Sequence, residues 1–392
     1  MDNSFSSPGA PPPLTSPPVI TPPPLRPRKS RGWMIFAIIL LVLLCLSLFG
    51  NLSQFVSRAL SFKGAINRSL GTTSARQAGP RLDEVLLQDN GARNKIAVVT
   101  VNCIITSHTS DSAGNDMVDI IKAQLDRAND DSRVRAVILK VDSPGGEVMA
   151  SDQINKLIAD FEADKPAKDG QPAKRGKPVI CSMGSLAASG GYYISAPCRW
   201  IVADDLTLTG SIGVIMESVN YRALMDKVGI EPYVFKSGKF KDMLSGMRET
   251  NEIPSEEHAM VQALVDETYH KFKDVVRDGR GQAHDKNQLQ GHPHAADWEK
   301  YADGRVLSGT QALTLGFVDE LGTFEDAVER AEKIAHIDNA NVVEYRERYD
   351  ISDFLSMFGQ SSSAKNIKLD IGLDIPKLQA GYLYFLSPTF VN

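Results

Sequence analysis

The sequence predicts an α/β fold of layered, mostly parallel strands, preceded by one transmembrane helix. From about residue 94, an apolar β-branched run, a glycine turn and an amphipathic stretch recur several times, which is typical of parallel strands joined by helices. Upstream, residues 33–49 form an apolar run in which only Ser47 is polar. The composition, 42% hydrophobic and 23% charged, fits a globular enzyme and excludes a disordered or collagen-like chain.

Residues 1–31 are predicted to be a disordered tail on the N-terminal side. Ten of the 21 prolines lie before residue 28. Closely spaced prolines favour polyproline II and cannot build a core. A docking site for a proline-reading partner is the alternative to a plain solvated tail.

Residues 32–50 are predicted to be a single uncleaved membrane anchor. At about 1.5 Å per residue, the apolar run nearly spans the hydrocarbon core of a bilayer. A buried helix seldom lacks a polar face over this length. A cleavable signal peptide is disfavoured by the long preceding tail and by the lack of an A-x-A-like site directly after the run.

Basic residues on either side of the anchor indicate its orientation. Four lie just before it and three more dispersed ones follow: Arg26, Arg28, Lys29 and Arg31, then Arg58, Lys63 and Arg68. The positive-inside rule then places the N-terminus in the cytoplasm and the rest of the chain outside it. Residues 51–94 are expected to be a linker with a short amphipathic helix, at the membrane surface or between subunits.

The core is expected over residues 95–345, and residues 346–392 are expected to form a peripheral tail. Five apolar runs are predicted strands: 96–105, 135–141, 178–183, 199–203 and 231–236. Four amphipathic stretches are predicted helices: 116–128, 148–162, 218–228 and 255–278. A further helix is expected to begin in the sequence GSLAASGGYY, and residues 209–214 continue the series.

Several kinds of chemistry are disfavoured by the sequence. The net charge of −5 argues against a nucleic-acid partner. No C-x-x-C pair, H-E-x-x-H motif or phosphate-binding glycine loop occurs, so we expect neither a metal nor a cofactor. The polar stretch with His284, His292 and His294 is interpreted as a solvated loop.

Two strand-end loops are candidates for an active site. Residues 142–146 end in Gly145 and Gly146, whose N–H groups could bind an oxyanion; a tight turn that needs glycine only for its dihedral angles is the alternative. Residues 184–191 are nearly all small, and Ser189 stands at the head of a predicted helix. That serine could be a nucleophile or only a helix N-cap.

A serine nucleophile needs a base, and no histidine is suitably placed. A desolvated lysine with a lowered pKa can serve instead. Three candidates follow the predicted strand 231–236: Lys236, Lys239 and Lys241. Position alone does not choose among them, and a surface role is the common alternative for any lysine.

Five blocks in order resemble the signal peptide peptidase A family, the S49 serine proteases. They are SPGG, GSLAASGGYYIS, TGSIGVI, SGKFKDML and DGRVLSGTQALTLGFVDELG, and the resemblance covers roughly residues 95–340. It implies a ClpP/crotonase-like fold and a Ser–Lys dyad. Ser189 then corresponds to the nucleophile, Lys241 to the general base and Ser211 to the serine that orients the lysine. The N–H groups of Gly145, Gly146 and Gly190 would form the oxyanion hole.

The resemblance also implies a function and an assembly. The chain carries one set of motifs, like the short forms of the family, which implies a homo-oligomeric ring whose active sites are shared between neighbouring subunits. We expect a membrane-anchored, extracytoplasmic endopeptidase that degrades cleaved signal peptides or other hydrophobic peptides. The alternatives are a crotonase-like acyl-CoA enzyme, a protease acting on stomatin-like membrane proteins, and a scaffold with a vestigial dyad.

Overall fold

The computed structural model describes residues 40, 79–107, 115–167, 173, 175–288, 290–347 and 383–386. The chain divides into two units, Met1–Gln77 and Ala78–Asn392, and all of these residues except Leu40 belong to the second. The predicted proline-rich tail, and the predicted anchor apart from Leu40, lie outside the described residues. Within the described ranges, no helix is both long enough and apolar enough to cross a bilayer.

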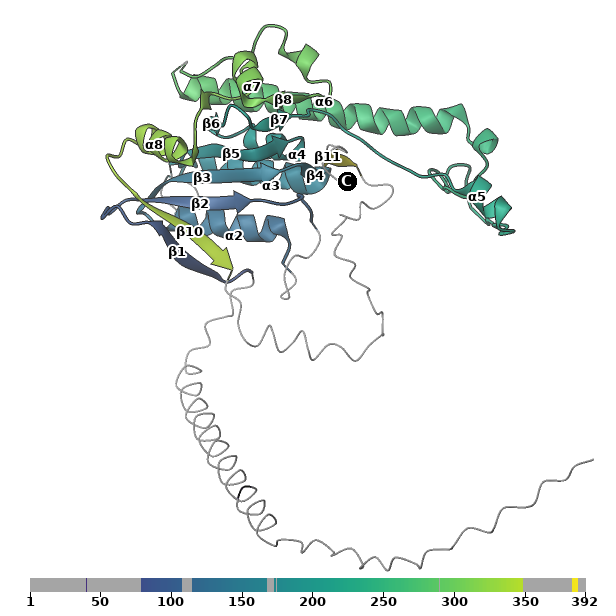
Figure 1. The fold of residues 1–392 in the computed structure, drawn as a ribbon, viewed down its shortest axis with the longest axis horizontal. Helices are drawn as coiled ribbons and strands as arrows, with labels where there is room; N and C mark the ends of the chain where they lie inside the picture. The colour runs from purple at the N-terminus through teal and green to yellow at the C-terminus, as the bar shows by residue number, and fades with distance from the viewer. Residues whose placement is uncertain are drawn as a thin grey trace, which may run out of the picture. The chain divides into compact units, whose positions relative to one another are not determined.

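The second unit is a mixed α/β structure (Figure 1). Its strands are β1 (Leu82–Gln88), β2 (Lys95–Val101), β3 (Val134–Ser143), β4 (Gly145–Glu147), β5 (Val179–Ala188), β6 (Trp200–Ala203), β7 (Leu208–Gly210), β8 (Val306–Ser308), β9 (Glu320–Leu321), β10 (Asn341–Glu347) and β11 (Tyr384–Leu386). Its α-helices are α2 (Met117–Asp130), α3 (Val148–Glu162), α4 (Gly190–Ser195), α5 (Arg222–Lys227), α6 (Ser255–Lys286), α7 (Gly309–Leu315) and α8 (Phe324–Ala335). Two short 3-10 helices are η1 (Thr250–Glu252) and η2 (Trp298–Tyr301).

A mostly parallel sheet forms the centre of this unit. Its strand order is β1-β10-β2-β3-β5-β6-β9, and the neighbouring strands from β10 to β9 all run parallel. β1 closes one edge in the antiparallel direction. β7 pairs with the far end of β5 in parallel, and β8 pairs with β7 antiparallel. The carboxyl ends of β3, β5 and β7 therefore lie side by side, which is where α/β folds place their sites.

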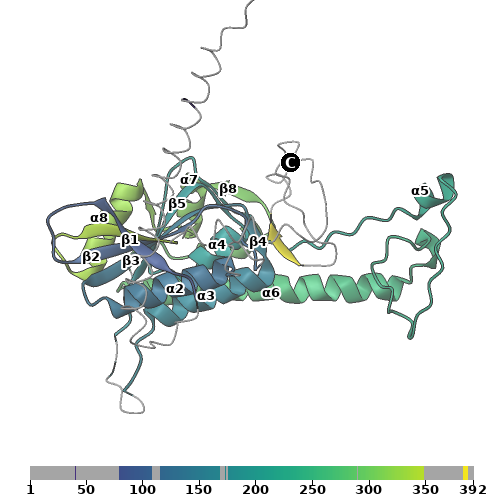
Figure 2. The same ribbon diagram turned by 90° about the horizontal axis from the view of Figure 1, so that it is seen from below.

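The alternation of side chains along β2 shows why the sheet is covered on both faces. Ala97, Val99 and Val101 enter a hydrophobic core with α2, α3 and α4, whereas Ile96 and Val98 enter a second core with α8. Figure 2 shows α2 and α3 packed together along one side of the sheet. A nearly continuous apolar run is what a strand buried on both faces requires, so the predicted strand 96–105 is confirmed as far as Val101, where β2 ends.

Two predicted elements in the segment before α6 differ in the structure. Residues 231–236 form no strand, and the predicted helix 218–228 shortens to α5. The run is apolar, but it has no strand beside it: Tyr233 is 77% exposed and Phe235 96% exposed. An apolar run predicts burial only where a partner is available, and among the described residues no strand pairs with this segment.

β1 lies inside the segment expected to be a linker. Its apolar residues do not alternate with polar ones, and Leu86 and Leu87 are exposed. Its sequence therefore lacks the alternation that predicts a half-buried strand. It is held by pairing with β10, which follows more than 250 residues later in the chain. The described α/β structure therefore begins before residue 95.

α6 is longer than the predicted 255–278 and has two different halves. Phe272, Val276, Arg280 and Ala283 recur at helical spacing and are buried, so the C-terminal half packs on the core. In the first half only Glu257 is buried. We call residues 216–254 the arm. Figures 1 and 2 both show the arm, with α5, beyond the sheet at the far end of α6.

Candidate active site

Ser189 occupies the turn between β5 and α4. Its backbone has φ 55° and ψ −115°, a conformation that costs a residue other than glycine about 1–3 kcal/mol and that clusters at functional sites. The turn is held by the Ser189 N–H, which donates to the carbonyl of Gly210 at 2.8 Å. The Ser189 side chain makes no capping hydrogen bond to α4. The N-cap alternative therefore fails, which leaves the hydroxyl available for chemistry.

The glycine turn after β3 packs directly against the first residue of α4. A Cβ on Gly145 would overlap the Phe385 carbonyl oxygen and stand 2.5 Å from the Gly190 nitrogen. A Cβ on Gly190 would stand 3.0 Å from both the Gly145 Cα and the Gly146 nitrogen. Only glycine permits this approach of backbones, so Gly145 and Gly190 are both needed for close packing, and Gly145 also for its φ of 101°.

The three predicted oxyanion-hole residues are thus brought together beside Ser189. Gly190 is the first residue of α4, so its N–H has no acceptor inside the helix and lies at the positive end of the peptide dipoles. The Gly145 N–H donates to Ser143 Oγ at 3.2 Å. The Gly145 N–H therefore has an acceptor within its own turn, whereas the Gly190 N–H has none inside α4.

Ser211 follows β7, the strand that pairs with the end of β5. In that pairing Gly210 lies opposite Ala188. Ser211 and Ser189 are the next residues along their two segments, so they leave the paired strands at the same level. Ser211 has φ 49°, is 5% exposed, and donates its N–H to the Arg305 carbonyl at 2.7 Å. The structure therefore gathers Ser189, Ser211 and the three glycines into one buried corner.

Lys241 lies elsewhere, on the arm. It is exposed, and so are the alternative lysines Lys236 and Lys239. Lys236 Nζ contacts the Asp242 carboxylate at 2.7 Å, and Lys239 pairs with Glu256 at 2.5 Å. Of the three lysines, Lys241 is the one that has no ion pair with an acidic side chain among the described residues. Within one chain, the predicted base and nucleophile are not brought together.

The arm is fixed to the first turns of α6 by a buried carboxylate. Glu257 is 3% exposed; it accepts a hydrogen bond from the Leu244 N–H at 3.0 Å and pairs with Arg248 at 2.6 Å. Burial acts to raise the pKa of Glu257, but these donors outweigh it and hold that pKa below its usual range. The segment that carries Lys241 therefore has a defined conformation of its own.

The histidine prediction was wrong for two of the three residues. His284 lies in α6, and His294 is stacked on Trp298 with ring centroids 4.6 Å apart. Burial, followed by the charge of Arg280, lowers the pKa of His294 to about 4. A polar neighbourhood in the sequence does not reveal that a ring is inserted between aromatic side chains.

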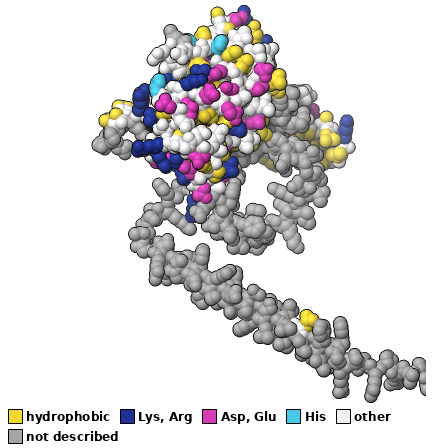
Figure 3. Space-filling view, turned by 60° about the vertical axis from the view of Figure 1, so that its left-hand side comes forward, with side chains coloured by type: hydrophobic (Ala, Val, Ile, Leu, Met, Phe, Trp, Pro, Cys, Tyr) yellow, Lys and Arg dark blue, Asp and Glu magenta, His cyan; other side chains and the backbone are white. Residues whose placement is uncertain are grey.

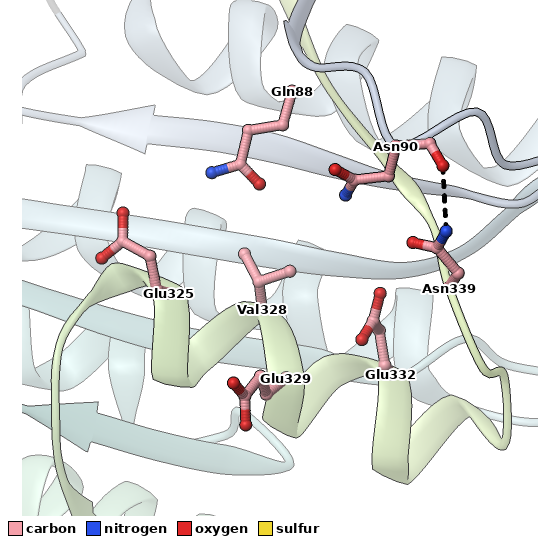
Figure 4. A pocket seen from close by; sticks show the side chains of 7 residues that line it. All are labelled: Gln88, Asn90, Glu325, Val328, Glu329, Glu332 and Asn339. Carbon is pink, nitrogen blue, oxygen red and sulfur yellow. Dashed lines mark hydrogen bonds between the residues drawn. The ribbon is translucent and has the colours of Figure 1, made fainter.

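Away from the glycine loops, a hollow of about 460 Å³ lies between α8 and the end of β1 (Figure 4). Figure 4 shows Glu325 and Glu332 on α8 pointing toward the side of the hollow that carries Gln88 and Asn90. α8 covers the face of the sheet opposite to α4, so this hollow is separate from Ser189. Among the described residues, no three His, Cys, Asp or Glu side chains form a group that could hold a metal ion.

The surface seen in Figure 3 carries acidic and basic side chains interspersed. Neither sign forms a continuous field on that face of the described residues.

Sequence comparisons identify the family. A profile described as peptidase family S49 matches residues 171–338, which include Ser189, Ser211 and Lys241. An Enterococcus faecium protein provisionally named signal peptide peptidase SppA is 33% identical over 282 residues, covering 70% of this chain and 73% of the relative. A protein of Synechocystis, provisionally named a protease, is 37% identical over 247 residues, covering 63% of this chain and 76% of the relative.

The chain belongs to peptidase family S49. It is also similar to the chloroplastic serine protease SPPA of Arabidopsis thaliana, 32% identical over 236 residues that cover 58% of this chain and 31% of that one. The chain is therefore a serine peptidase. Among solved structures, it is similar to a mutant of the 1510-N membrane-bound stomatin-specific protease, with 15% identity, a TM-score of 0.37, and coverage of 66% of this chain and all of that one.

β11 is the part of this S49 site that sequence reasoning missed. Tyr384, Phe385 and Leu386 lie in the segment expected to be a peripheral tail, yet they pair with β4, the strand formed by the glycine turn. Phe385 is fully buried in the main core. The apolar sequence YLYFL was the available signal, because it is a short run of strand-forming residues.

Proposed function

We propose that this S49 peptidase is a membrane-anchored endopeptidase with a Ser189–Lys241 dyad, and that it degrades cleaved signal peptides or other hydrophobic peptides. The observation that carries the proposal is the geometry of Ser189. Its hydroxyl makes no capping hydrogen bond, its backbone is held at a φ of 55° and a ψ of −115°, and the N–H of the next residue is unpaired within α4. This combination suits a nucleophile beside an oxyanion site better than it suits a structural turn.

The proposed reaction is acyl transfer through Ser189. Neutral Lys241 Nζ takes the Ser189 hydroxyl proton as Oγ attacks the peptide carbonyl carbon, and the N–H groups of Gly146 and Gly190 face the developing oxyanion. The C–N bond then breaks, and the lysine ammonium gives its proton to the leaving amine. Water attacks the resulting ester by the same route and frees Ser189. Ser211, which follows β7 beside Ser189, would orient the lysine.

The lysine of this dyad is proposed to come from a neighbouring copy of the chain. Lys241 is exposed on the arm, whereas a base lysine needs a desolvated site that favours its neutral form. The arm also exposes large apolar side chains in number: Val219, Leu224, Val228, Ile230, Tyr233 and Phe235. Packing of the arm on a second copy would bury this surface and bring Lys241 out of water.

The membrane anchor remains a proposal based on the sequence. The run over residues 33–49 has the length and composition of a membrane span, and the basic residues before it favour a cytoplasmic N-terminus with the peptidase domain on the other side. This location would expose the enzyme to signal peptides left in the membrane. Membership of a peptidase family favours this function over the crotonase-like alternative.

The test measures serine labelling and peptide cleavage by the full chain in detergent. Wild type should react with a fluorophosphonate at Ser189 and cleave a synthetic signal peptide, whereas Ser189→Ala should do neither. Lys241→Arg should fold but fail to cleave, because guanidinium stays protonated and cannot accept the proton. Lys239→Arg, two residues away on the same arm, is the matched control and should keep its activity. Substantial cleavage by Lys241→Arg would refute Lys241 as the base. Cleavage of a stomatin-like protein in preference to signal peptides would replace the proposed substrate.

A further inference from the structure

α6 is the element that joins the core to the arm. Its C-terminal half packs on the core, whereas in its first half only Glu257 is buried. Glu257 holds the arm, because its carboxylate accepts the Leu244 N–H at 3.0 Å and pairs with Arg248 at 2.6 Å. Lys241 lies three residues before Leu244. The place that Lys241 reaches therefore depends on the direction in which α6 leaves the core.

At Gly279, α6 touches the end of α4, the helix that follows Ser189. A Cβ on Gly279 would stand 2.6 Å from the Ala196 carbonyl oxygen and 3.1 Å from the Pro197 nitrogen. Ala196 is the C-cap residue of α4. Ordinary van der Waals contact begins at 3.4 Å, so a side chain at position 279 would force the two helices apart. This contact explains why a long helix keeps a glycine in its interior, where glycine is among the least favourable residues.

Gly281, two residues further along α6, has no such neighbour. It is exposed, and a Cβ at this position would meet nothing within 4 Å. Alanine at either position should favour the helix itself to the same extent, because the gain in helix propensity is the same. Only at position 279 would the added methyl group also press on α4. The two glycines therefore form a matched pair for experiment.

A clash between the two helices should move α6, because α4 is enclosed. Every residue of α4 is buried. Its two tyrosine hydroxyls are also held, since Tyr192 donates to the Phe317 carbonyl and Tyr193 donates to Asp152, both at 2.8 Å. The first half of α6, with its single buried residue, has much less packing to resist a change of direction.

The length of α6 amplifies a small movement at Gly279. The ring of Phe272 contacts that of Tyr193, with centroids 4.9 Å apart, and provides a pivot. At about 1.5 Å per residue, Gly279 lies about 10 Å from Phe272, and Glu257 lies about 22 Å away on the other side. A retreat of about 0.8 Å at Gly279 then becomes about 1.7 Å at Glu257. A misplacement of about 1 Å can lower a rate about a hundredfold.

We infer that α6 positions Lys241 for the dyad, that the contact of Gly279 with the end of α4 sets the direction of α6, and that Glu257 fixes the arm to it. Gly279 and Glu257 are thus positioning residues that act through the lysine. This inference rests on the proposed dyad shared between copies, and it makes a specific claim about that dyad. The α6 of each chain places the lysine of a neighbour's site and has no part in placing the serine of its own.

The test adds Gly279→Ala to one chain of a complementing pair of full-length chains. In a mixture of Ser189→Ala and Lys241→Ala, the first chain supplies the lysine and the second supplies the serine. Gly279→Ala in the lysine-supplying chain should lower the restored kcat/KM at least tenfold, whereas in the serine-supplying chain it should change kcat/KM less than twofold. Gly281→Ala, the matched control, should change it less than twofold in either chain. Equal losses from Gly279→Ala in the two chains, or no loss in either, would overturn the inference.

Glu257→Gln tests the other end of α6 and decides the inference if Gly279→Ala does not fold. In the lysine-supplying chain it should lower the restored kcat/KM at least threefold, because it weakens the attachment of the arm. In the serine-supplying chain it should have no effect. Glu256→Gln is the matched control, since its ion pair with Lys239 is exposed and exposed pairs contribute little. Equal effects of Glu257→Gln and Glu256→Gln would overturn the role of Glu257.

A distance measurement follows the arm without catalysis. Spin labels are attached through Ser185→Cys and Lys239→Cys, two exposed positions, in a full-length chain that also carries Cys45→Ser and Cys103→Ser. Dilution with unlabelled chains ensures that each measured distance lies within one copy. Gly279→Ala should shift the mean distance by at least about 1 Å, and Gly281→Ala should leave it unchanged.

The two kinds of measurement separate the inference from the proposed function. If Gly279→Ala shifts the arm but the plain mixture of Ser189→Ala and Lys241→Ala is inactive, the shared dyad fails and the control of the arm by α6 stands. If the plain mixture is active but the arm does not shift, or shifts equally in Gly281→Ala, the shared dyad stands and the inference is wrong.

Discussion

Mixing two inactive variants should restore activity if the site is completed by a neighbouring copy. The perturbations are Ser189→Ala and Lys241→Ala. Each removes one half of the proton relay, so each protein alone should be inactive. The structure motivates the mixture because Ser189 lies in the core at 1% exposure, whereas Lys241 is exposed on an arm that is hydrogen-bonded to the first turns of α6.

The expected activity of the mixture depends on the fraction of subunit boundaries that carry a complete dyad. A working boundary needs an intact Ser189 from a Lys241→Ala chain and an intact Lys241 from the adjacent Ser189→Ala chain. With equal amounts and random assembly in a closed ring, about one quarter of the boundaries meet both conditions, whatever the number of subunits. The yield should fall on either side of equal mixing, because it is the product of the two fractions.

The assay is cleavage of a fluorogenic signal-peptide mimic after co-expression of differently tagged full-length chains and sequential purification on both tags. Ser185→Ala and Lys239→Ala are the matched controls, since both residues are exposed and lie in the same two segments. Each control should be active alone. If the doubly purified mixture is inactive although both chains are present, each site lies within one chain and the arm has another role.

Three further predictions concern single residues. Burial raises the pKa of Glu162 from 4.5 to about 7, so between these pH values the folded state retains a proton that the unfolded state releases. The free energy of unfolding, measured by urea titration, should therefore fall by up to about 3 kcal/mol as the pH rises from about 4.5 to 7, and Glu162→Gln should remove this dependence on pH. Asp319→Ala should lower the free energy of unfolding by about 3–5 kcal/mol, because it leaves the buried Arg280 charge unpaired and the Ile201 N–H without its acceptor. An unchanged urea midpoint for Asp319→Ala would contradict this expected loss of stability. Ser211→Ala should reduce kcat/KM less than Ser189→Ala does, since one hydrogen bond is worth about 0.5–1.5 kcal/mol; equal losses would mean that Ser211 does more than orient the lysine.

The central strands and the two glycine loops were predictable because their determinants are local. β2 is buried on both faces, and such a strand needs a nearly continuous apolar run that can be read directly from the sequence. Positions 145 and 190 require glycine because the neighbouring backbones approach too closely for a side chain, and a required glycine is visible in the sequence at that position. The order of the motifs was enough to predict the family.

The arm shows where local reasoning stops. The segment around Tyr233 and Phe235 is apolar, so the sequence predicts a buried strand, but burial requires a partner that the described part of the chain does not supply. The apolar composition of this segment indicates that it is buried by some partner, but it does not identify that partner. The distance between Lys241 and the buried serines is decided by the direction of α6, a property of the whole fold.

The α/β class, the loops of the candidate site and the candidate reactive residues can be read from local sequence patterns. The return of residues 384–386 to that site depends on how the whole chain folds. Three residues can add to a strand wherever an edge offers free N–H and C=O groups, and the sequence of Tyr384–Leu386 does not specify that edge. The ring of Phe385 fits there because Tyr193 and Phe272, which lie 79 residues apart in the chain, are brought within 4.9 Å of each other by folding.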